Sequence, residues 1–521
     1  MSLIKRKGDS RLNIALIILL LVTGCAQNNR TGIKPPERTD TSATETVIET
    51  SLPAQTTQIT PPSAPTSIPD PINPLTGLAV ADPSLLDLPA VLVSISTFPV
   101  TARPQAGLSF APYVFEIYIT EGTTRYLTTF YGEFPAPEAP VTGSCETRNA
   151  PFVQTDLIIG NRIWLDENRN NVQDDWERGI GGVCVNLYDD NQTLLQQTST
   201  DSNGYYGFNV STGKYFVAVE KPNNMEFSQK DAGDEGQDSD VDQASGWSDA
   251  LDISSTFLHL DAGLILLEES LPTSELPPAR VGPVRSGRLI YADIADFFAG
   301  SCLIFAYASA EVLVELPVCA FVDHNIQGGG YMLDISEMER LVQEREDPQT
   351  RSNYASNIFS AEPPEGGAPA SRLDVFVAWL NQTGWAYDPL SGSWWRYVDN
   401  GKAQTAGILH TEIDRLTGRQ LLFENVIVLF TEHDVISPTN LDIHLDRGLT
   451  GKALLFRDGQ MYSIRWSTEN DSPIQFQFED GRPFPLKPGH TWVTVVTPLT
   501  ALTEKKPGEW WLRFHQPPGS K

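Results

Sequence analysis

Short apolar runs separated by turn residues dominate the last third of the chain. From residue 373 onward, runs rich in Val, Ile, Leu and aromatic residues recur between Gly, Pro and Asp. This spacing is typical of antiparallel strands, which need only tight turns between them. The pattern predicts a mainly antiparallel β C-terminal body over residues 370–500. Its clearest predicted strands are 426–430, 453–456, 462–466 and 492–496.

The first body mixes two hydrophobic periods. Residues 90–95 and 114–119 are apolar runs of strand length, whereas residues 289–298 and 335–343 space their apolar side chains as a helix does. We therefore expect a mixed α/β N-terminal body and an α+β multidomain chain. The body is predicted to comprise two segments, residues 73–135 and 278–350.

Between these two segments lies a stretch of different character. Pro-rich sequence at 135–140 and 276–278 flanks an acidic, turn-rich region, and 20 acidic residues face 6 basic ones between residues 156 and 264. Pro-rich junctions are typical of domain boundaries. The pattern predicts a separate domain over residues 155–265, inserted into the first body.

The N-terminus has the three parts of an export signal. Basic residues precede an apolar run at 12–22 that is short for a transmembrane span, and small residues then precede Cys25. This order resembles the lipobox of bacterial lipoproteins, whose cysteine is lipidated. We expect residues 1–25 to direct export and Cys25 to anchor the chain at the extracytoplasmic face of the cell membrane. An uncleaved anchor helix is the alternative.

Residues 26–72 are rich in Thr, Ser and Pro and contain no aromatic residue. Such a segment cannot bury enough apolar surface to offset the entropy of ordering it. We predict a disordered linker that gives the folded part reach from the membrane.

Charge and motif content narrow the functional classes. The formal net charge of −29 repels phosphate backbones, so nucleic acid is not an expected partner. The sequence contains no HExxH, GxSxG or P-loop spacing, and the usual hydrolase and nucleotide-binding classes therefore lack sequence support.

Residues 166–177 alternate oxygen-bearing side chains as a calcium-binding loop does. Ca²⁺ takes about six to eight oxygen ligands, and alternate positions of such a loop point inward at one ion. Asn171 stands where Gly is usual, but Asn enters the left-handed backbone region more easily than most residues. The predicted Ca²⁺ ligands are Asp166, Asn168, Asn170, Val172 through its carbonyl, Asp174 and Glu177. A solvated acidic loop is the alternative.

The region around this loop resembles the B-type domain of the serine-aspartate repeat surface adhesins. The likeness continues through the turn and strand at 200–208 to the closing strand at 260–264. It implies a calcium-stiffened β-sandwich of the prealbumin or Cna B type that serves as a rigid spacer or presentation module. The resemblance also suggests a second Ca²⁺ held by Asp238, Asp240 and Asp242, with a plain acidic turn as the alternative.

The flanking sequence resembles the YerB-like lipoprotein family, whose function is unknown. The likeness rests on Asn-Pro-Leu-Thr-Gly at 73–77, Arg-Ser-Gly-Arg at 285–288, Phe-Arg-Asp-Gly at 456–459 and Pro-Gly-His-Thr-Trp at 488–492. It covers both bodies and implies no particular activity.

Charged residues of the first body could line one polar cleft. Paired carboxylates can perform acid and base chemistry on a glycan, and arginines can grip an anionic ligand. The same residues can instead form ion pairs that fix the fold, which we favour. The set is Arg103, Glu116, Glu121, Arg125, Arg285 and Arg288.

Two further groups of residues have open interpretations. Cys302 and Cys319 flank two apolar runs, and either a disulfide or two buried thiols fits them. An aromatic cluster in the second body could stack sugars, although a core role is favoured. Its members are Trp379, Trp385, Tyr387, Trp394, Trp395 and Tyr397.

Together these features predict a membrane-anchored, surface-exposed lipoprotein that acts as an envelope binding or scaffold protein. Its expected partners are the membrane, through the lipid, and a cell-wall or other envelope component. Two alternatives stay open. One is a glycan-active enzyme using Glu116 and Glu121, and the other is an adhesin that displays the inserted domain. We lean against an enzyme.

Overall fold

The computed structural model describes residues 71–267, 276–321, 331–345, 354–437, 440–469 and 472–520. The residues predicted as signal peptide and most of the predicted linker lie outside these ranges. Strands far outnumber helices in the described part, and none of its helices is both long and apolar enough to cross a bilayer. The α-helices are α1 (Ile290–Asp296), α2 (Ala310–Leu313) and α3 (Ile335–Gln343). Short 3-10 helices are η1 (Pro83–Asp87), η2 (Val100–Ala102), η3 (Leu108–Phe110) and η5 (Ala403–Thr405).

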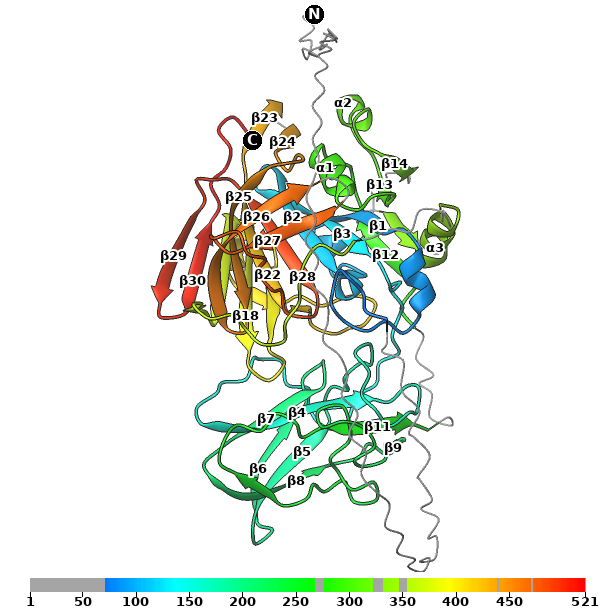
Figure 1. Cartoon of the computed structure of the whole chain (residues 1–521), viewed down its shortest axis with the longest axis vertical. Helices are drawn as coiled ribbons and strands as arrows, with labels where there is room; N and C mark the ends of the chain where they lie inside the picture. The colour runs from blue at the N-terminus through cyan, green and yellow to red at the C-terminus, as the bar shows by residue number, and fades with distance from the viewer. Residues whose placement is uncertain are drawn as a thin grey trace, which may run out of the picture. The chain divides into compact units, whose positions relative to one another are not determined.

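One 13-stranded sheet runs through both predicted bodies (Figure 1). The first segment of the chain contributes β1 (Val91–Ser96), β2 (Tyr113–Thr120), β3 (Thr123–Phe130), β12 (Arg280–Val284), β13 (Cys302–Phe305), β14 (Val318–Phe321) and β15 (Tyr331–Asp334). The last segment contributes β16 (Ala368–Pro369), β22 (Asn425–Phe430), β25 (Thr450–Arg457), β26 (Gln460–Glu469), β27 (Ser472–Gln477) and β28 (Thr491–Val496). The two sets meet where β2 pairs in parallel with β28, from Tyr113 opposite Thr491 to Ile117 opposite Val495.

The expectation of an α+β chain with a mixed α/β N-terminal body is wrong. Strands make up 44% of the structure and helical residues 8%, so the fold is mostly β. The helical period at 289–298 yields only the seven-residue α1, and the period at 335–343 yields α3. The apolar strands of this segment pair mainly with one another, and β2 pairs with β28 from the far end of the chain, so the segment is part of the large sheet and not a separate α/β layer structure.

A seven-stranded sheet packs on the large one through aromatic side chains. Trp385 lies edge-on to Trp492 with ring centroids 5.4 Å apart, and Trp394 lies edge-on to Phe456 at 5.6 Å. These rings belong to one continuous core. The strands are β17 (Arg372–Ala378), β18 (Asn381–Asp388), β19 (Ser393–Asp399), β20 (Leu409–Thr411), β21 (Leu422–Phe423), β29 (Ala501–Lys506) and β30 (Glu509–Arg513). A separate hairpin is formed by β23 (His433–Ser437) and β24 (Asn440–Ile443).

The inserted segment forms a β-sandwich with a core of its own (Figure 1, cyan to green). Its two four-stranded sheets have the orders β10-β8-β5-β6 and β7-β4-β11-β9. The predicted β-sandwich is therefore confirmed. The strands are β4 (Leu157–Leu165), β5 (Cys184–Asp189), β6 (Leu194–Ser199), β7 (Tyr205–Val210), β8 (Gly213–Val219), β9 (Met225–Phe227), β10 (Leu251–Ile253) and β11 (Ala262–Leu266).

Candidate functional site

The predicted calcium loop connects β4 to β5 and is wound around its first residue. One carboxylate oxygen of the buried Asp166 accepts the backbone N–H of Asn171 (3.1 Å) and the hydroxyl of Ser228 (2.8 Å). Asn171 has a φ of 66°, so it takes the left-handed conformation that this loop position requires. The other carboxylate oxygen of Asp166 is buried without any hydrogen-bond partner.

Side chains along the loop hold its turns. The Asn168 side-chain oxygen accepts the N–H of Asn170 (2.9 Å), and the Asn170 side-chain oxygen accepts the N–H of Val172 (2.8 Å). Each is an Asx turn, in which the side chain replaces a backbone acceptor two residues before the donor. The local sequence alone is therefore enough to curl this loop.

Glu177 closes the loop from its far end. Its buried carboxylate accepts the backbone N–H groups of Glu167 (2.8 Å) and Asp174 (3.2 Å). The pKa of Glu177 is raised to about 7, chiefly by burial and also by the nearby charges of Asp166 and Asp174, while the two hydrogen bonds act in the opposite direction. A cation at this place would relieve the crowding of negative charge.

The loop has the ligand types for Ca²⁺ but not a closed coordination shell. Asp174 accepts the amide groups of Asn168 (2.8 Å) and Asn170 (3.0 Å), which points two nitrogens inward. Within the described ranges, no three His, Cys, Asp or Glu side chains are placed to hold a metal together. The unpartnered oxygen of Asp166 fits a cation, and binding would require both amides to turn their oxygens toward it.

The second predicted calcium cluster is only partly assembled. Asp238 and Asp240 influence each other electrostatically, and burial raises the pKa of Asp240 to about 7. Asp242 instead caps its own turn, accepting the N–H groups of Ala244 (3.2 Å) and Ser245 (2.9 Å), which lowers its pKa. Asp242 is therefore engaged in its own turn, which leaves Asp238 and Asp240 as the remaining members of the predicted cluster.

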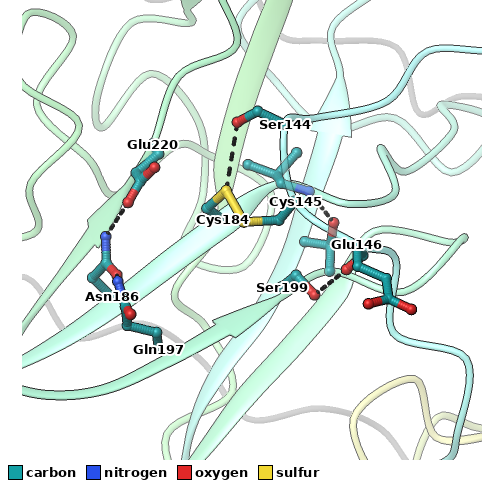
Figure 2. The surroundings of a disulfide bond; sticks show 10 residues. Ser144, Cys145, Glu146, Cys184, Asn186, Gln197, Ser199 and Glu220 are labelled. Carbon is teal, nitrogen blue, oxygen red and sulfur yellow. Dashed lines mark hydrogen bonds between the residues drawn. A yellow bond between two sulfur atoms is a disulfide. The ribbon is translucent and has the colours of Figure 1, made fainter.

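Two disulfides are present. Cys302 and Cys319 join the neighbouring strands β13 and β14. Cys145 and Cys184 join the segment that enters the insert to β5, as Figure 2 shows. Nothing in the sequence singled out the second pair, because 39 residues separate its cysteines and no short motif connects them.

Ion pairs also tie the insert to the body. Arg148 lies 2.6 Å from Asp201 of the insert and 3.5 Å from Asp388 of the body. The Glu138 carboxylate accepts a hydrogen bond from the Arg419 guanidinium (2.5 Å) and lies 3.8 Å from that of Arg178. Glu138, Arg178 and Arg419 also line a cavity of about 480 Å³ whose walls come from both parts. The ion pairs among these three residues restrain this side of the junction.

The six residues of the predicted polar cleft do not form one cleft. Glu116 is 1% exposed and binds the fully buried Arg396 (3.1 Å), the Trp492 indole N–H (3.1 Å) and the Thr124 hydroxyl (3.1 Å). Glu121 is exposed in the β2–β3 turn with a φ of 50°. Arg103 donates to the backbone carbonyls of Thr97 and Asp399. The structure brings together only Arg125, Arg285 and Arg288.

The residue that organises Glu116 escaped the sequence reasoning. Arg396 pairs with Glu116 and with the buried Glu412 (2.9 Å), and its guanidinium lies 4.1 Å from the centre of the Trp492 ring. It stands in an aromatic stretch of β19, 280 residues from Glu116, and no local signal marks the pairing.

Most of the aromatic cluster is core. Trp385, Trp394 and Trp395 are buried, Tyr387 and Tyr397 are half-buried, and Trp379 is 62% exposed. A flat platform needs adjacent exposed rings, so these six residues do not provide one.

Three family models match the chain. The DUF3048 N-terminal domain, of unknown function, matches residues 75–148, the SdrD B-like domain matches residues 157–264, and the DUF3048 C-terminal domain matches residues 374–493. This chain carries both DUF3048 domains with an SdrD B-like insert. Both parts of the recognition made from sequence motifs are therefore confirmed.

Curated relatives match the insert alone. The Fibrinogen-binding protein of Staphylococcus epidermidis is 40% identical over 100 residues, which are 19% of this chain and 9% of that protein. Serine-aspartate repeat-containing protein F of S. epidermidis is 39% identical over 84 residues, 16% of this chain and 5% of that protein. Serine-aspartate repeat-containing protein D of Staphylococcus aureus (strain Newman) is 40% identical over 78 residues, which are 15% of this chain and 6% of that protein. The chain thus spans less than a tenth of these relatives.

A solved structure, the YerB protein from Bacillus subtilis, covers 82% of this chain and 97% of its own. The two sequences are 16% identical in the alignment, and the TM-score is 0.44.

The buried ion pairs of Arg396 predict a large effect of one substitution. Replacing Arg396 with Met leaves two carboxylates unpaired in the core, which costs about 3–5 kcal/mol. We expect the thermal midpoint of the body to fall by roughly 6 °C or more, measured by circular dichroism. Arg482→Met, which removes the exposed pair with Asp480, is the control and should change it little. Equal small shifts in both variants would contradict the structural role of Arg396.

Proposed function

We propose that this protein is a lipoprotein held on the outer face of a membrane through Cys25, where it acts as an envelope binding or scaffold protein. The observation that carries the proposal is an SdrD B-like sandwich bound into a DUF3048 body by a disulfide and ion pairs. A module tied in this way is suited to hold a fixed position. The two disulfides fit an oxidising, extracytoplasmic compartment.

Calcium would make the insert stiffer. The ligands are Asp166, Asn168, Asn170, the Val172 carbonyl, Asp174 and Glu177, with Asp238 and Asp240 as the core of a second site. Ca²⁺ supplies positive charge to carboxylates that now repel one another and joins the two ends of the β4–β5 loop. Because Asp166 also binds Ser228, which directly follows β9, the ion would connect the loop to the sandwich.

The glycan-cleaving alternative finds no geometric basis in its two carboxylates. Glu116 is buried, where it pairs with Arg396 and accepts a hydrogen bond from the Trp492 indole. Glu121, in contrast, is exposed in a turn. Paired acid and base catalysis needs both groups to face one bond at about 5–10 Å, and a carboxylate without access to substrate cannot serve.

A second candidate function is adhesion through the insert. It is favoured by the relatives, since three proteins named as serine-aspartate repeat or fibrinogen-binding proteins match this region. In this case the insert would contact a partner of its own, and the body would only present it.

The calcium proposal predicts that the protein binds Ca²⁺ in solution. The soluble chain, residues 26–521, should bind Ca²⁺ with a dissociation constant of about 0.1–1 mM by calorimetry, the range of extracellular modules. Asp166→Asn and Glu177→Gln should each weaken binding at least tenfold, and Asp252→Asn, at an exposed acid of the same insert, should not. Affinity should fall from pH 7.5 to pH 6, because a protonated Glu177 is a poor ligand. Absence of uptake at millimolar calcium would end the stiffening proposal.

The anchor is tested by Cys25→Ser. Without the thiol no lipid can be attached, so the full-length protein should move from the detergent phase to the aqueous phase in a partition assay. A matched Cys145→Ser/Cys184→Ser variant, which removes a disulfide but keeps the anchor, should remain in the detergent phase. A Cys25→Ser protein that still partitions with detergent would favour the uncleaved helix.

Co-sedimentation with purified cell-wall sacculi separates the two functions. Under the scaffold proposal the soluble chain pellets saturably, and a variant lacking residues 155–264, with Cys145→Ser to remove the unpaired thiol, still pellets. If no pelleting occurs with or without calcium, while the deletion abolishes attachment to cells, adhesion through the insert replaces the scaffold role.

A further inference from the structure

Two arginines of the body bond to one serine, and a third directly precedes that serine in the sequence. Arg125 of β3 donates to the Ser286 hydroxyl (3.3 Å) and carbonyl (3.2 Å), and Arg288 donates to the same hydroxyl (3.1 Å). Arg285 directly precedes that serine at the end of β12 and lies close enough to Arg125 to affect its charge. The two guanidinium groups that share the Ser286 hydroxyl lie within two hydrogen-bond lengths of each other.

These cations are buried but have no negative partner in the part of the chain that the structure describes. Arg125 is 7% exposed and Arg285 is 6% exposed, and the Nε–H groups of Arg125, Arg285 and Arg288 all lack an acceptor there. Arg288, which is half-buried, bonds only to Ser286 and to the Gly287 carbonyl. No ion pair in the described ranges includes any of the three.

Other buried or half-buried arginines of the described chain are paired with acids. Arg396 has two carboxylates, Arg457 has Asp458 at 2.6 Å, and Arg148 has Asp201 at 2.6 Å. A buried charge is strongly unfavourable unless it is paired. The contrast therefore indicates that the partner of the arginine cluster is not one of the described carboxylates.

Among the described residues, the hydrogen-bond neighbours of the cluster add neutral hydroxyl groups. Ser94 of β1 and Tyr291 of α1 share a hydrogen bond (3.0 Å), and Ser94 also donates to the Ser286 carbonyl (3.2 Å). The pKa of Arg125 is lowered to about 9, chiefly by burial and also by the positive charges of Arg288 and Arg285, with Tyr291 acting in the opposite direction. The cluster is thus short of negative charge, and Ser286 and Arg288 leave it partly open to solvent.

We propose that Arg125, Arg285 and Arg288 form a binding site for a phosphate-type oxyanion. Arginine forks bind phosphate oxygens in bidentate fashion. Arg125 and Arg288 meet at Ser286 and Arg285 adjoins it, and the oxygens of a tetrahedral phosphate can accept from all three groups. This site belongs to the DUF3048 body and requires neither the calcium loop nor the lipid anchor.

The same chemistry occurs in a free phosphate, a small phosphate ester and the headgroup of an anionic lipid. The experiment therefore uses the soluble chain, residues 26–521, with three probes: inorganic phosphate, glycerol 3-phosphate, and vesicles of phosphatidylglycerol against phosphatidylcholine. Binding is measured by calorimetry, and stability by the thermal midpoint of unfolding, both at constant ionic strength. Chloride is the reference anion, because it screens charge equally but has no tetrahedral arrangement of oxygens.

The informative variants are Arg288→Gln and Arg285→Gln, compared with Arg280→Gln. Arg280 begins β12, the strand that ends just before Arg285. It is half-exposed and pairs with Asp334 (2.8 Å), so Arg280→Gln controls for the loss of a surface charge. We expect saturable binding of at least one probe, weakened tenfold or more in both cluster variants and less than twofold in Arg280→Gln. Without the anion, neither cluster variant should melt below wild type, since each removes an unneutralised charge.

The outcomes are distinct. Binding of the small phosphates assigns the site to a soluble anion or ester, and binding of phosphatidylglycerol vesicles alone assigns it to a lipid headgroup. Either result supports the site if the cluster variants lose it. No saturable binding of any probe, or equal losses in Arg280→Gln and Arg288→Gln, overturns the proposal.

Discussion

The ion-pair network of Arg396 is the interaction on which the body depends. The guanidinium group lies fully buried between Glu116 of β2 and Glu412, and the rings of Trp492 and Trp385 cover it. A buried charge tolerates little displacement from its partners, because desolvation is offset only at short range. The network therefore fixes how the seven-stranded sheet lies on the large one, and it joins residues from opposite ends of the sequence into a single core.

That closed core explains how the body accommodates an inserted domain. The chain leaves the large sheet after β3 and re-enters it at β12, and both strands pair with β1. The two ends of the insertion thus return to neighbouring positions in a sheet that is complete without it. The Cys145–Cys184 disulfide, the Arg148 ion pairs and the Glu138–Arg419 pair then restrain the insert close to where it departs. Such a connection limits hinge motion at the junction, which suits a scaffold better than a flexible tether.

The features that the sequence predicted correctly depend on residues close to one another in the chain. The turns of the β4–β5 loop could be read because each Asx turn joins residues two apart, and Asn171 supplies the left-handed φ within the same loop. Calcium binding by this loop stays a prediction. The sandwich followed from short strands and a recognisable family pattern. Glu116 forms a buried ion pair, as the favoured interpretation of its segment expected, but its partner could not be named because that partner lies 280 residues away and β2 gives no sign that a cation will approach it. The mixed α/β expectation failed for the same reason: an apolar run reports burial, but only the partner strand decides whether it joins a sheet or stands beside helices.

The β4–β5 loop and the arginine cluster both contain buried charge without a partner, negative in the loop and positive in the cluster. In the loop, buried carboxylates crowd together and an oxygen of Asp166 has no partner; in the cluster, buried guanidinium groups crowd together and three Nε–H groups have none. Elsewhere in the described body, Arg396 and Arg457 show that this fold pairs a buried charge when it can. The proposed calcium and oxyanion sites account for the charge that the chain leaves unpaired at these two places. On both proposals, ions from an extracytoplasmic environment would supply the missing opposite charge.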